Sequence, residues 1–260
     1  MSVQRPSVFE ELKKVDALVD ARNEPEMVIE RLPFTVRVVR SEEDLRKAVG
    51  IRHSAYARHM PEFAESLRVA EEDDVQDDTV VLLAESKLDG SVLGSVRIQS
   101  NRRRPLNLEH SISLPVWLKE RPLAQVRRLA IVQGSSGRLV KMILVKACFR
   151  YCECNDIEWA LLGARQSLKR SYEQLMFSDI LDGETYLPPP QSNNVPAYVM
   201  AFEIETGKAR WTAANHPLLN FFCYTHHPDI DVDTTVANVH GIRFAHEIQY
   251  SKATSSSASM

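Results

Sequence analysis

A short loop of small residues, Gln133 to Arg138, could bind an anion. It reads QGSSGR and lies between a predicted strand at 126–132 and a predicted long helix from Leu139 to about Cys154. A helix that begins in such a loop presents unpaired N–H groups and the positive end of its dipole to an anion. Small residues let a phosphate approach the backbone, and Arg138 adds a charged donor. A pyrophosphate or phosphopantetheine is therefore a candidate ligand, with an ordinary connecting loop as the alternative.

Three arginines are expected to need carboxylate partners. Arg52 has apolar neighbours on a predicted helix, Arg97 lies inside a predicted strand, and Arg128 follows the start of another strand. A guanidinium that faces inward is stable only when it is paired, and the acidic run 71–78 supplies partners. Such a cluster could hold the amino and carboxylate groups of an amino acid. The alternative is a purely structural network of salt bridges.

Nucleotides and nucleic acids are both disfavoured as ligands. The loop has neither the Gly-Lys-Ser/Thr order of a Walker A motif nor a G-x-G-x-x-G pattern. The formal net charge of −3 argues against a dedicated nucleic-acid binder, which normally presents a strongly basic surface.

The cysteines indicate reduced thiols rather than a disulfide framework. Three of the four, Cys148, Cys152 and Cys154, crowd into one predicted helix, and Cys223 stands apart. The adjacent histidines at 226–227 have no second half of a ligand set, so no metal site is predicted. A cysteine nucleophile at Cys148 or Cys223 remains a minor alternative, because neither has a recognisable Cys/His arrangement around it.

Composition predicts a globular protein of the cytoplasm. The chain has 260 residues, of which 44% are hydrophobic and 26% charged. No apolar stretch approaches the roughly 18 residues that cross a bilayer, and the first nine residues lack the apolar core of a signal peptide. We therefore expect neither a membrane span nor export.

The predicted elements that position these residues belong to a mixed α/β protein. The clearest is a hairpin, in which strands 79–86 and 91–100 flank an Asp-Gly turn. Before it, a strand at 34–40 is followed by a helix from about Glu42 to His59 that Ser41 caps. After the long helix come a strand at 156–163, a helix at 167–177, a strand at 195–205 and a helical candidate at 217–224. This order predicts an α/β fold with a central mixed sheet flanked by helices.

The sequence predicts that the chain is organised in four segments. Residues 1–31 form a predicted appendage of two helices, 32–205 the main domain, 206–250 an extension that packs on it, and 251–260 a disordered, serine-rich tail.

The strand, loop and helix around residue 133 resemble the GNAT superfamily of N-acyltransferases. There, a Q/R-x-x-G-x-G/A-like loop holds the pantetheine arm of an acyl donor, and Arg138 stands here in the last position of that pattern. The resemblance implies a GNAT-like fold and an acyl-phosphopantetheine or acyl-CoA co-substrate, with no tightly bound cofactor. The implied pantetheine site comprises Ile131, Val132, Gln133, Ser136, Gly137 and Arg138.

A tyrosine in the same family often protonates the departing thiolate, in a segment like Y-x-x-L-G-F. Residues 172–177, YEQLMF, resemble it, with methionine in the glycine position. A phenol with a pKa near 10 is a sensible acid for a thiolate of similar or lower basicity. Tyr172 is therefore the candidate acid, with a packed helical tyrosine as the alternative.

Residues 34–204 also resemble acyl-homoserine-lactone synthases and the related long-chain N-acyl amino acid synthases. Gln125 stands where the lactone synthases have glutamate, and Arg127 where they have serine. The segments at 74–79, 195–200 and 226–231 are closer to the N-acyl amino acid synthases, which favours that branch. The implied catalytic residues are Tyr172, Asp77, Gln125 and Arg128, and the implied substrate-binding residues are Arg52, Tyr56, Glu72, Asp74 and Arg97.

The implied activity is transfer of a long-chain acyl group to the amine of an amino acid or a similar small amine. A lactone-type signal synthase and a non-catalytic sensor of acyl thioesters are the alternatives. Acyl carrier proteins are acidic, so basic clusters could dock one as the donor. The candidate contacts are Arg102, Arg103, Arg104, Arg138, Lys141, Lys146 and Arg150.

Overall fold

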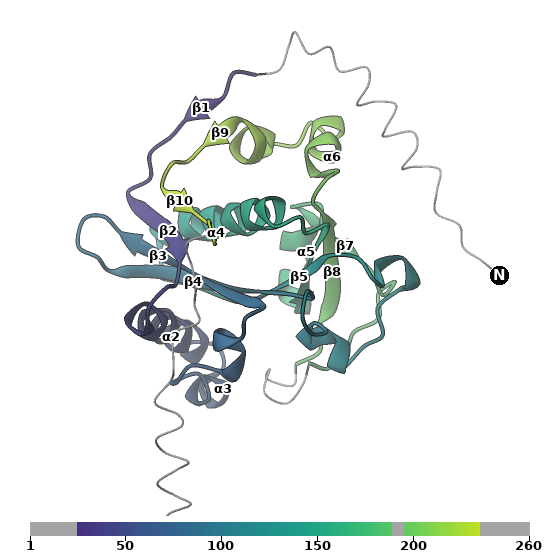
Figure 1. The fold of residues 1–260 in the computed structure, drawn as a ribbon, viewed down its shortest axis with the longest axis horizontal. Helices are drawn as coiled ribbons and strands as arrows, with labels where there is room; N and C mark the ends of the chain where they lie inside the picture. The colour runs from purple at the N-terminus through teal and green to yellow at the C-terminus, as the bar shows by residue number, and fades with distance from the viewer. Residues whose placement is uncertain (1–24, 189–194, 235–260) are drawn as a thin grey trace, which may run out of the picture.

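The centre of the molecule is a mixed sheet of eight strands, seen edge-on across Figure 1. The computed structural model describes residues 25–188 and 195–234. Within them the strand order is β10-β2-β3-β4-β5-β6-β8-β7, with parallel pairing at β10/β2 and β5/β6. The strands are β2 (Phe34–Val38), β3 (Thr79–Ser86), β4 (Val92–Ser100), β5 (Leu123–Ile131), β6 (Trp159–Ala164), β7 (Ser178–Asp179), β8 (Tyr198–Glu203) and β10 (Ile230–Asp231).

Helices cover both faces of this sheet (Figure 1). The long helix α4 (Ser135–Cys154) lies along one face, and α2 (Glu42–Ala57) with α3 (Pro61–Glu65) lies on the other. The remaining helical elements are η1 (Glu72–Val75), η2 (Asn107–His110), η3 (Val116–Leu118), α5 (Gln166–Glu173), α6 (Gly207–Ala213) and the π-helix η5 (Asn220–Tyr224). None of the described helices is long and apolar enough to cross a membrane.

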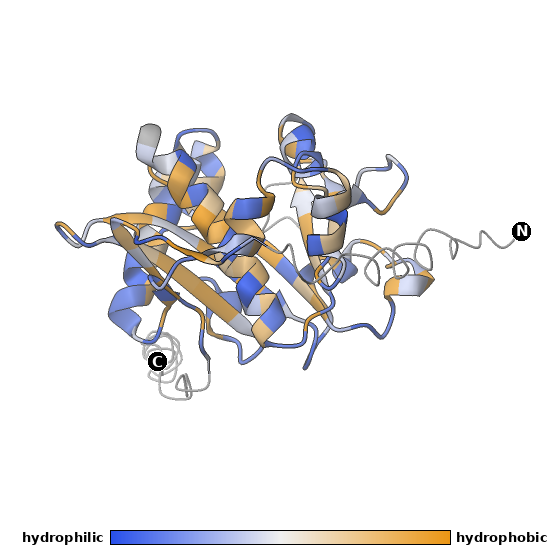
Figure 2. Cartoon of the chain, turned by 90° about the horizontal axis from the view of Figure 1, so that it is seen from above, coloured by the Kyte–Doolittle hydropathy of each residue, from blue (hydrophilic) through white to orange (hydrophobic). Residues whose placement is uncertain are grey.

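Strand β3 shows why the sheet needs cover on both sides. Leu82 packs in the cluster that includes α4, whereas its neighbours Val81 and Leu83 pack against α2. Successive side chains of a strand point to opposite faces, so a nearly continuous apolar run is stable only between two layers. Figure 2 shows the hydrophobic residues concentrated on the central strands and the inner sides of the helices.

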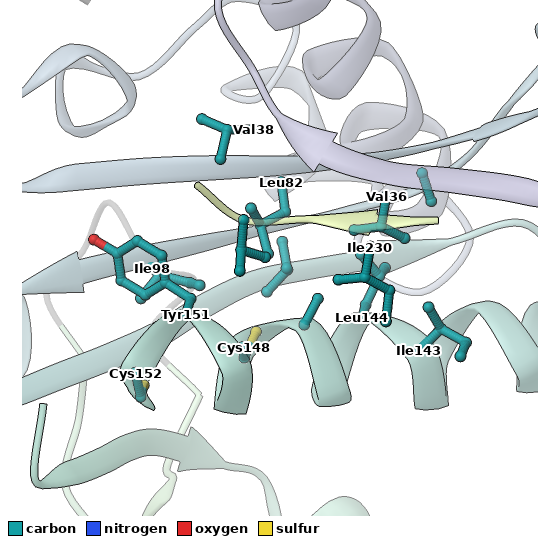
Figure 3. Close-up of a cluster of buried hydrophobic side chains, with 14 of the residues drawn as sticks. Val36, Val38, Leu82, Ile98, Ile143, Leu144, Cys148, Tyr151, Cys152 and Ile230 are labelled. Carbon is teal, nitrogen blue, oxygen red and sulfur yellow. The ribbon is translucent and has the colours of Figure 1, made fainter. Parts of the chain in front are cut away.

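The larger core lies between the sheet and α4. In Figure 3, Val36, Leu82, Ile98 and Ile230 come from four strands and lie beside the α4 residues Ile143, Leu144, Cys148 and Tyr151. The last of these strands is β10, which pairs with β2 at the sheet edge. Residues after 205 thus contribute to the same core as the long helix.

The predicted helix after Ser41 is confirmed. The Ser41 hydroxyl accepts from the Asp44 N–H at 3.1 Å, and the helix ends at Ala57, two residues before the predicted end. The hairpin of β3 and β4 is also confirmed.

Several predicted boundaries are wrong. Helix α4 begins at Ser135, inside the predicted loop, with Gly134 at the N-cap, a position that glycine fits. Strand β5 begins three residues earlier than predicted, at Leu123, where it pairs with β6. The predicted helix at 217–224 is the short π-helix, and α6 was missed.

Only the end of the predicted N-terminal appendage lies within the described residues. Val28–Ile29 forms strand β1, which pairs with β9 (Thr225–His226), so the second predicted helix is wrong there. The extended form is stabilised by hydrogen bonds to a segment far along the chain, which local pattern does not reveal. The predicted leading helix before residue 25 and the tail at 251–260 lie outside the described residues.

Candidate active site

The sheet opens between its two central parallel strands. Residues 123–125 of β5 pair with residues 159–161 of β6, and the pairing between the two strands ends there. Each strand stays paired on its outer side, β5 with β4 and β6 with β8. The strands therefore diverge beyond Gln125, and a cleft of about 390 Å³ lies between them.

A bulge in β5 accompanies this divergence. Ser95 faces Ala130 and Arg97 faces Arg127, so two residues of β5 lie opposite the single residue Val96. One of the two, Arg128, has φ +56°, a left-handed conformation that is uncommon for arginine. Neighbouring side chains of a regular strand point to opposite faces, yet Arg127 and Arg128 both reach the segment at 71–74. The bulge turns the Arg128 side chain to the same face as that of Arg127, so both can reach this segment.

Four guanidinium groups meet three carboxylates beside the cleft. Arg52 and Asp74 form two hydrogen bonds of 2.8 and 2.9 Å, and Arg97 donates to the same carboxylate at 3.1 Å. The Arg128 Nε donates to Glu71 at 2.7 Å. The fourth pair joins Arg127 to Asp73 at 3.3 Å.

The arginines keep these buried carboxylates ionised. Burial alone would raise the pKa of Asp74, but the hydrogen bonds and charges of Arg52 and Arg97 outweigh it and hold the pKa below its usual value. Burial likewise opposes ionisation of Glu71, and Arg128 leads the groups that lower its pKa. The network joins η1, α2, β4 and β5 into one frame.

The network contains part of the predicted acidic set. Asp74 lies in it with Arg52, Arg97 and Arg128, the three arginines that were expected to need carboxylate partners. Glu72 is exposed, and Asp77 has half of its side-chain surface exposed and pairs with Arg103 instead. Sequence reasoning missed the roles of Glu71 and Asp73. The signal was the three-residue spacing in Glu71-x-x-Asp74, which forms a capping box in η1.

The cleft wall is cationic. Its lining includes the basic side chains Arg58, Arg127, Arg128, Lys141 and Arg165, and no Asp or Glu of the described residues is among the lining. Burial and the neighbouring arginines lower the pKa of Arg127 to about 10, which leaves it charged at neutral pH. Apolar side chains such as Leu108, Leu129 and Leu162 line the rest. Such a wall suits a ligand with an anionic group and an apolar part.

Gln125 is a structural anchor at the point where the strands diverge. It is 3% exposed, and its Oε1 accepts from the Leu108 N–H at 3.1 Å, which fixes η2 over the sheet. An amide side chain cannot take up a proton at neutral pH.

Two predicted tyrosines line the cleft. Tyr56 contacts Phe63 edge-on, with ring centroids 5.7 Å apart. Tyr172 packs edge-on to Phe177 at 5.8 Å, and the Lys141 ammonium lies 6.0 Å from its ring centre. Burial raises the pKa of Tyr172 to about 12, so its phenol stays protonated at neutral pH.

The predicted pantetheine loop follows the open end of β5. Ile131 lines the cleft, and its carbonyl accepts from Arg58 at 3.0 Å. A Cβ on Gly137 would lie 2.3 Å from the Val132 carbonyl oxygen, so only glycine allows the helix to start this close to the strand. Gln133, Ser136 and Arg138 are exposed at the helix N-terminus.

The predicted basic docking residues fall into separate places. Arg102 donates to the Asn155 carbonyl, Arg103 pairs with Asp77, and Arg104 binds Asp78 at 2.7 Å. Arg150 is half-buried on the last turns of α4.

Lys146 is not available to a partner. It is 3% exposed and donates to the Phe221 and Thr225 carbonyls. The prediction that it belongs to an exposed patch is wrong, because residues after 205 cover this face of α4.

The thiols are poorly suited to nucleophilic attack. Burial raises the pKa of Cys148 to about 12, and burial also raises the pKa of Cys223. A thiol is nucleophilic as the thiolate, so both are inert at neutral pH. All four cysteines are free, and within residues 25–188 and 195–234 no group of three His, Cys, Asp or Glu side chains is placed to hold a metal ion.

Comparison with known families identifies the fold and the activity class. The model of the family described as N-acyl amino acid synthase FeeM matches residues 47–203, which include the ion-pair network, both cleft strands and Tyr172. The chain belongs to the N-acyl amino acid synthase FeeM family. It is therefore an acyltransferase, and the GNAT-like mixed α/β fold predicted from the sequence is confirmed.

Solved structures show the same fold at low sequence identity. FeeM, an N-acyl amino acid synthase from uncultured soil microbes, is 14% identical, with a TM-score of 0.53 over 72% of this chain and 96% of that one. BjaI, a CoA-dependent acyl-homoserine lactone synthase, is 16% identical, with a TM-score of 0.51 over 75% of this chain and 93% of that one. No curated protein sequence matches the chain.

Proposed function

We propose that the enzyme transfers an acyl group from a pantetheine thioester to the amine of an amino acid. The observation that carries this proposal is the cleft between β5 and β6, which is lined from both faces of the sheet. Lys141 and Tyr172 line it from the side of α4, and Leu108 and Tyr186 line it from the side of η2. Two substrates could therefore enter from opposite faces and meet between the strands.

The donor side is proposed to be the edge of β5. Beyond Gln125 this edge has no β6 partner among the described residues, so its backbone groups face the cleft. A pantetheine arm carries two amides and can add to such an edge as a short strand would. Its phosphate would then reach the N-terminus of α4, where N–H groups and the Arg138 side chain favour an anion.

The proposed reaction forms a C–N bond and breaks the C–S bond of the thioester. The amine nitrogen attacks the carbonyl carbon and loses a proton to water, the departing thiolate takes a proton from the Tyr172 phenol, and the phenolate regains one from water. A tyrosine whose pKa is about 12 holds that proton until the thiolate develops.

The acceptor amine is proposed to lose its proton without a carboxylate base. Gln125 is neutral, and the described lining of the cleft holds cations and no carboxylate. Nearby positive charges disfavour an ammonium ion, so a bound amine gives up its proton to water more readily than a free one.

The apolar part of the cleft supports a preference for long acyl chains. Val126 and Leu129 of β5 and Leu162 of β6 line the opening. Burying a methylene stabilises a complex by about 0.8 kcal/mol, so two extra carbons would tighten binding about tenfold. Equal rates with acetyl and dodecanoyl donors would contradict this part of the proposal.

The donor could be carried by coenzyme A or by an acyl carrier protein. Of the predicted docking residues, Arg138 and Lys141 lie at the cleft end of α4, and Lys141 lines the cleft. An acidic carrier protein would meet favourable charge there, and its binding would weaken with salt.

The deciding experiment is product analysis by mass spectrometry. Purified enzyme is incubated with dodecanoyl-CoA or a dodecanoyl carrier protein and a pool of the twenty amino acids. An N-dodecanoyl amino acid establishes the activity and names the acceptor. An acyl-homoserine lactone formed only when S-adenosylmethionine is added would move the enzyme to the lactone branch, and intact thioester in every mixture would refute the proposal.

A further inference from the structure

The basic side chains that line the cleft differ in whether a carboxylate neutralises them. Arg127 and Arg128 belong to the ion-pair network beside the cleft. No carboxylate of the described residues forms an ion pair with the other three, which are Arg58, Lys141 and Arg165. These three are the positive charges that an anionic ligand in the cleft could neutralise.

Arg58 and Arg165 stand at the open ends of the two cleft strands. Arg58 is the C-cap of α2, and it donates at 3.0 Å to the carbonyl of Ile131, the last residue of β5. Arg165 directly follows β6, as the N-cap of α5, and donates to the sulfur of Met60. Because Met60 lies two residues after Arg58, the turn between α2 and α3 brings a cation from each side of the opening to the same end of the cleft.

Both cations lie on the face of the sheet opposite α4. Leu162 of β6 packs with Phe149 of α4, so Arg165, three residues further on, points to the other face. Its contact with Met60 agrees, because Met60 precedes α3, which lies on that other face (Figure 1). Lys141, by contrast, is a residue of α4 itself.

We infer that Arg58 and Arg165 bind the carboxylate of the acceptor amino acid. The inference rests on the proposed function and assigns residues to one of its two substrates. In that function the donor phosphate belongs at the N-terminus of α4, on the side where Lys141 lies. The acceptor then enters from the α2 face, where Arg58 and Arg165 are the lining cations that no described carboxylate neutralises.

The hydrogen bonds that the two arginines already make leave their charge available. A guanidinium carries five N–H groups, and Arg58 uses two of them on the neutral carbonyls of Ser54, at 3.4 Å, and Ile131. Arg165 donates to a thioether, which is a weak acceptor. A carboxylate forms shorter and stronger bonds with a guanidinium than either of these partners does. Neither side chain is fixed by burial, because Arg58 is exposed and Arg165 only half-buried.

The test compares a pool of the twenty amino acids with a pool of their α-carboxamides, with dodecanoyl-CoA as the donor. Initial rates of thiol release and product masses are measured for the native enzyme, Arg58→Gln and Arg165→Gln. Each variant should raise the half-saturating concentration of the acid pool about tenfold, because it removes a charge-assisted bond to the carboxylate. The half-saturating concentrations of the carboxamide pool and of dodecanoyl-CoA should change less than about threefold.

Arg170→Gln is the matched control. Arg170 lies on α5 with an exposed side chain, as a cation outside the cleft lining. Its loss should change each half-saturating concentration less than about twofold, because solvent and salt screen its charge. An effect on the acid pool as large as that of Arg165→Gln would show that only long-range charge acts, and it would overturn the carboxylate site.

The two pools separate this site from a structural role and from the donor. Equal losses for acids and carboxamides in Arg58→Gln and Arg165→Gln would overturn the carboxylate site while leaving the proposed function intact. A change confined to the half-saturating concentration of dodecanoyl-CoA would also overturn it and would assign the pair to the donor phosphate. Intact thioester with both pools and the native enzyme would refute the proposed function, and the carboxylate site with it.

Discussion

Arg52 on helix α2 and Asp74 in η1 form a two-bond ion pair that solvent does not reach. The arginine is 1% exposed and the aspartate side chain 0%, and the two hydrogen bonds measure 2.8 and 2.9 Å. Because Asp74 also binds Arg97 on β4, this pair fixes the helix to the strand beside the cleft. A buried pair of this kind positions elements, and removing one partner leaves a buried charge uncompensated.

Arg52→Met should destabilise the fold by about 3–5 kcal/mol, because Asp74 would then be buried without its main partner. Arg103→Met is the matched control: Arg103 is 62% exposed and pairs with a half-exposed aspartate, so its loss should cost at most about 1 kcal/mol. Urea unfolding followed by circular dichroism measures both. Equal losses in the two variants would show that the buried pair has no special role.

Stability should fall as the medium becomes acidic. A carboxylate with a lower pKa in the folded chain than in the unfolded chain stabilises the fold above its unfolded pKa, and the contribution is lost as pH falls through its folded pKa. Asp74 and Glu71 are lowered in this way by their arginine partners, so the loss should occur below about pH 4. Urea midpoints at pH 7 and pH 3 test this. The drop should be smaller in Arg52→Met, where Arg97 alone of the two arginines still lowers the pKa of Asp74; an unchanged drop would contradict the assignment.

Tyr172→Phe should lower kcat by about 10²-fold or more with little change in KM, because a general acid acts in the transition state. Tyr151→Phe is the control: Tyr151 is a buried tyrosine on α4 whose pKa burial likewise raises to about 12, but it packs in the main core. A thioester whose thiol is a better leaving group needs less help from an acid. Such a donor should restore more of the lost kcat in Tyr172→Phe than in Tyr151→Phe. Similar kcat values for the two variants would exclude Tyr172 as the acid.

The sequence predicted the strand–loop–helix unit and the arginine cluster because both depend on local pattern. Arg52, Arg97 and Arg128 were expected to need carboxylates, and Asp74 meets two of them. What local pattern could not predict depends on pairing between distant segments. The bulge at Arg128, the β1/β9 pairing and the burial of Lys146 under residues 221–227 all follow from contacts far apart in the chain. The choice of Glu71 over Glu72 depended on the turn of η1, which a run of acidic residues does not specify.

Charge reversal should locate the carrier docking surface at the cleft end of α4. Arg138→Glu should raise KM for a dodecanoyl carrier protein about tenfold, because the acidic carrier would meet a negative charge. Because the side chain is exposed, kcat and the free energy of unfolding should change little. Arg103→Glu, beyond the other end of the helix, should change KM less than about threefold. Steady-state kinetics at two salt concentrations measure both, and a larger effect of Arg103→Glu would move the docking surface to that end.

Gln125→Glu should change the pH dependence of the reaction. The substituted carboxylate can still accept from the Leu108 N–H, and it would add a proton acceptor to a cleft lined by cations. With the proposed loss of the amine proton to water, kcat/KM should rise with pH as a larger share of the free acceptor amine is deprotonated. A base beside the amine removes part of that dependence, and the ratio of kcat/KM at pH 6 to that at pH 9 should rise about tenfold.

Gln99→Glu is the matched control, since Gln99 is equally buried and accepts from the Asn107 N–H at 3.1 Å without lining the cleft. The same change of ratio in Gln99→Glu, or an unchanged ratio in Gln125→Glu, would contradict proton loss without a carboxylate base.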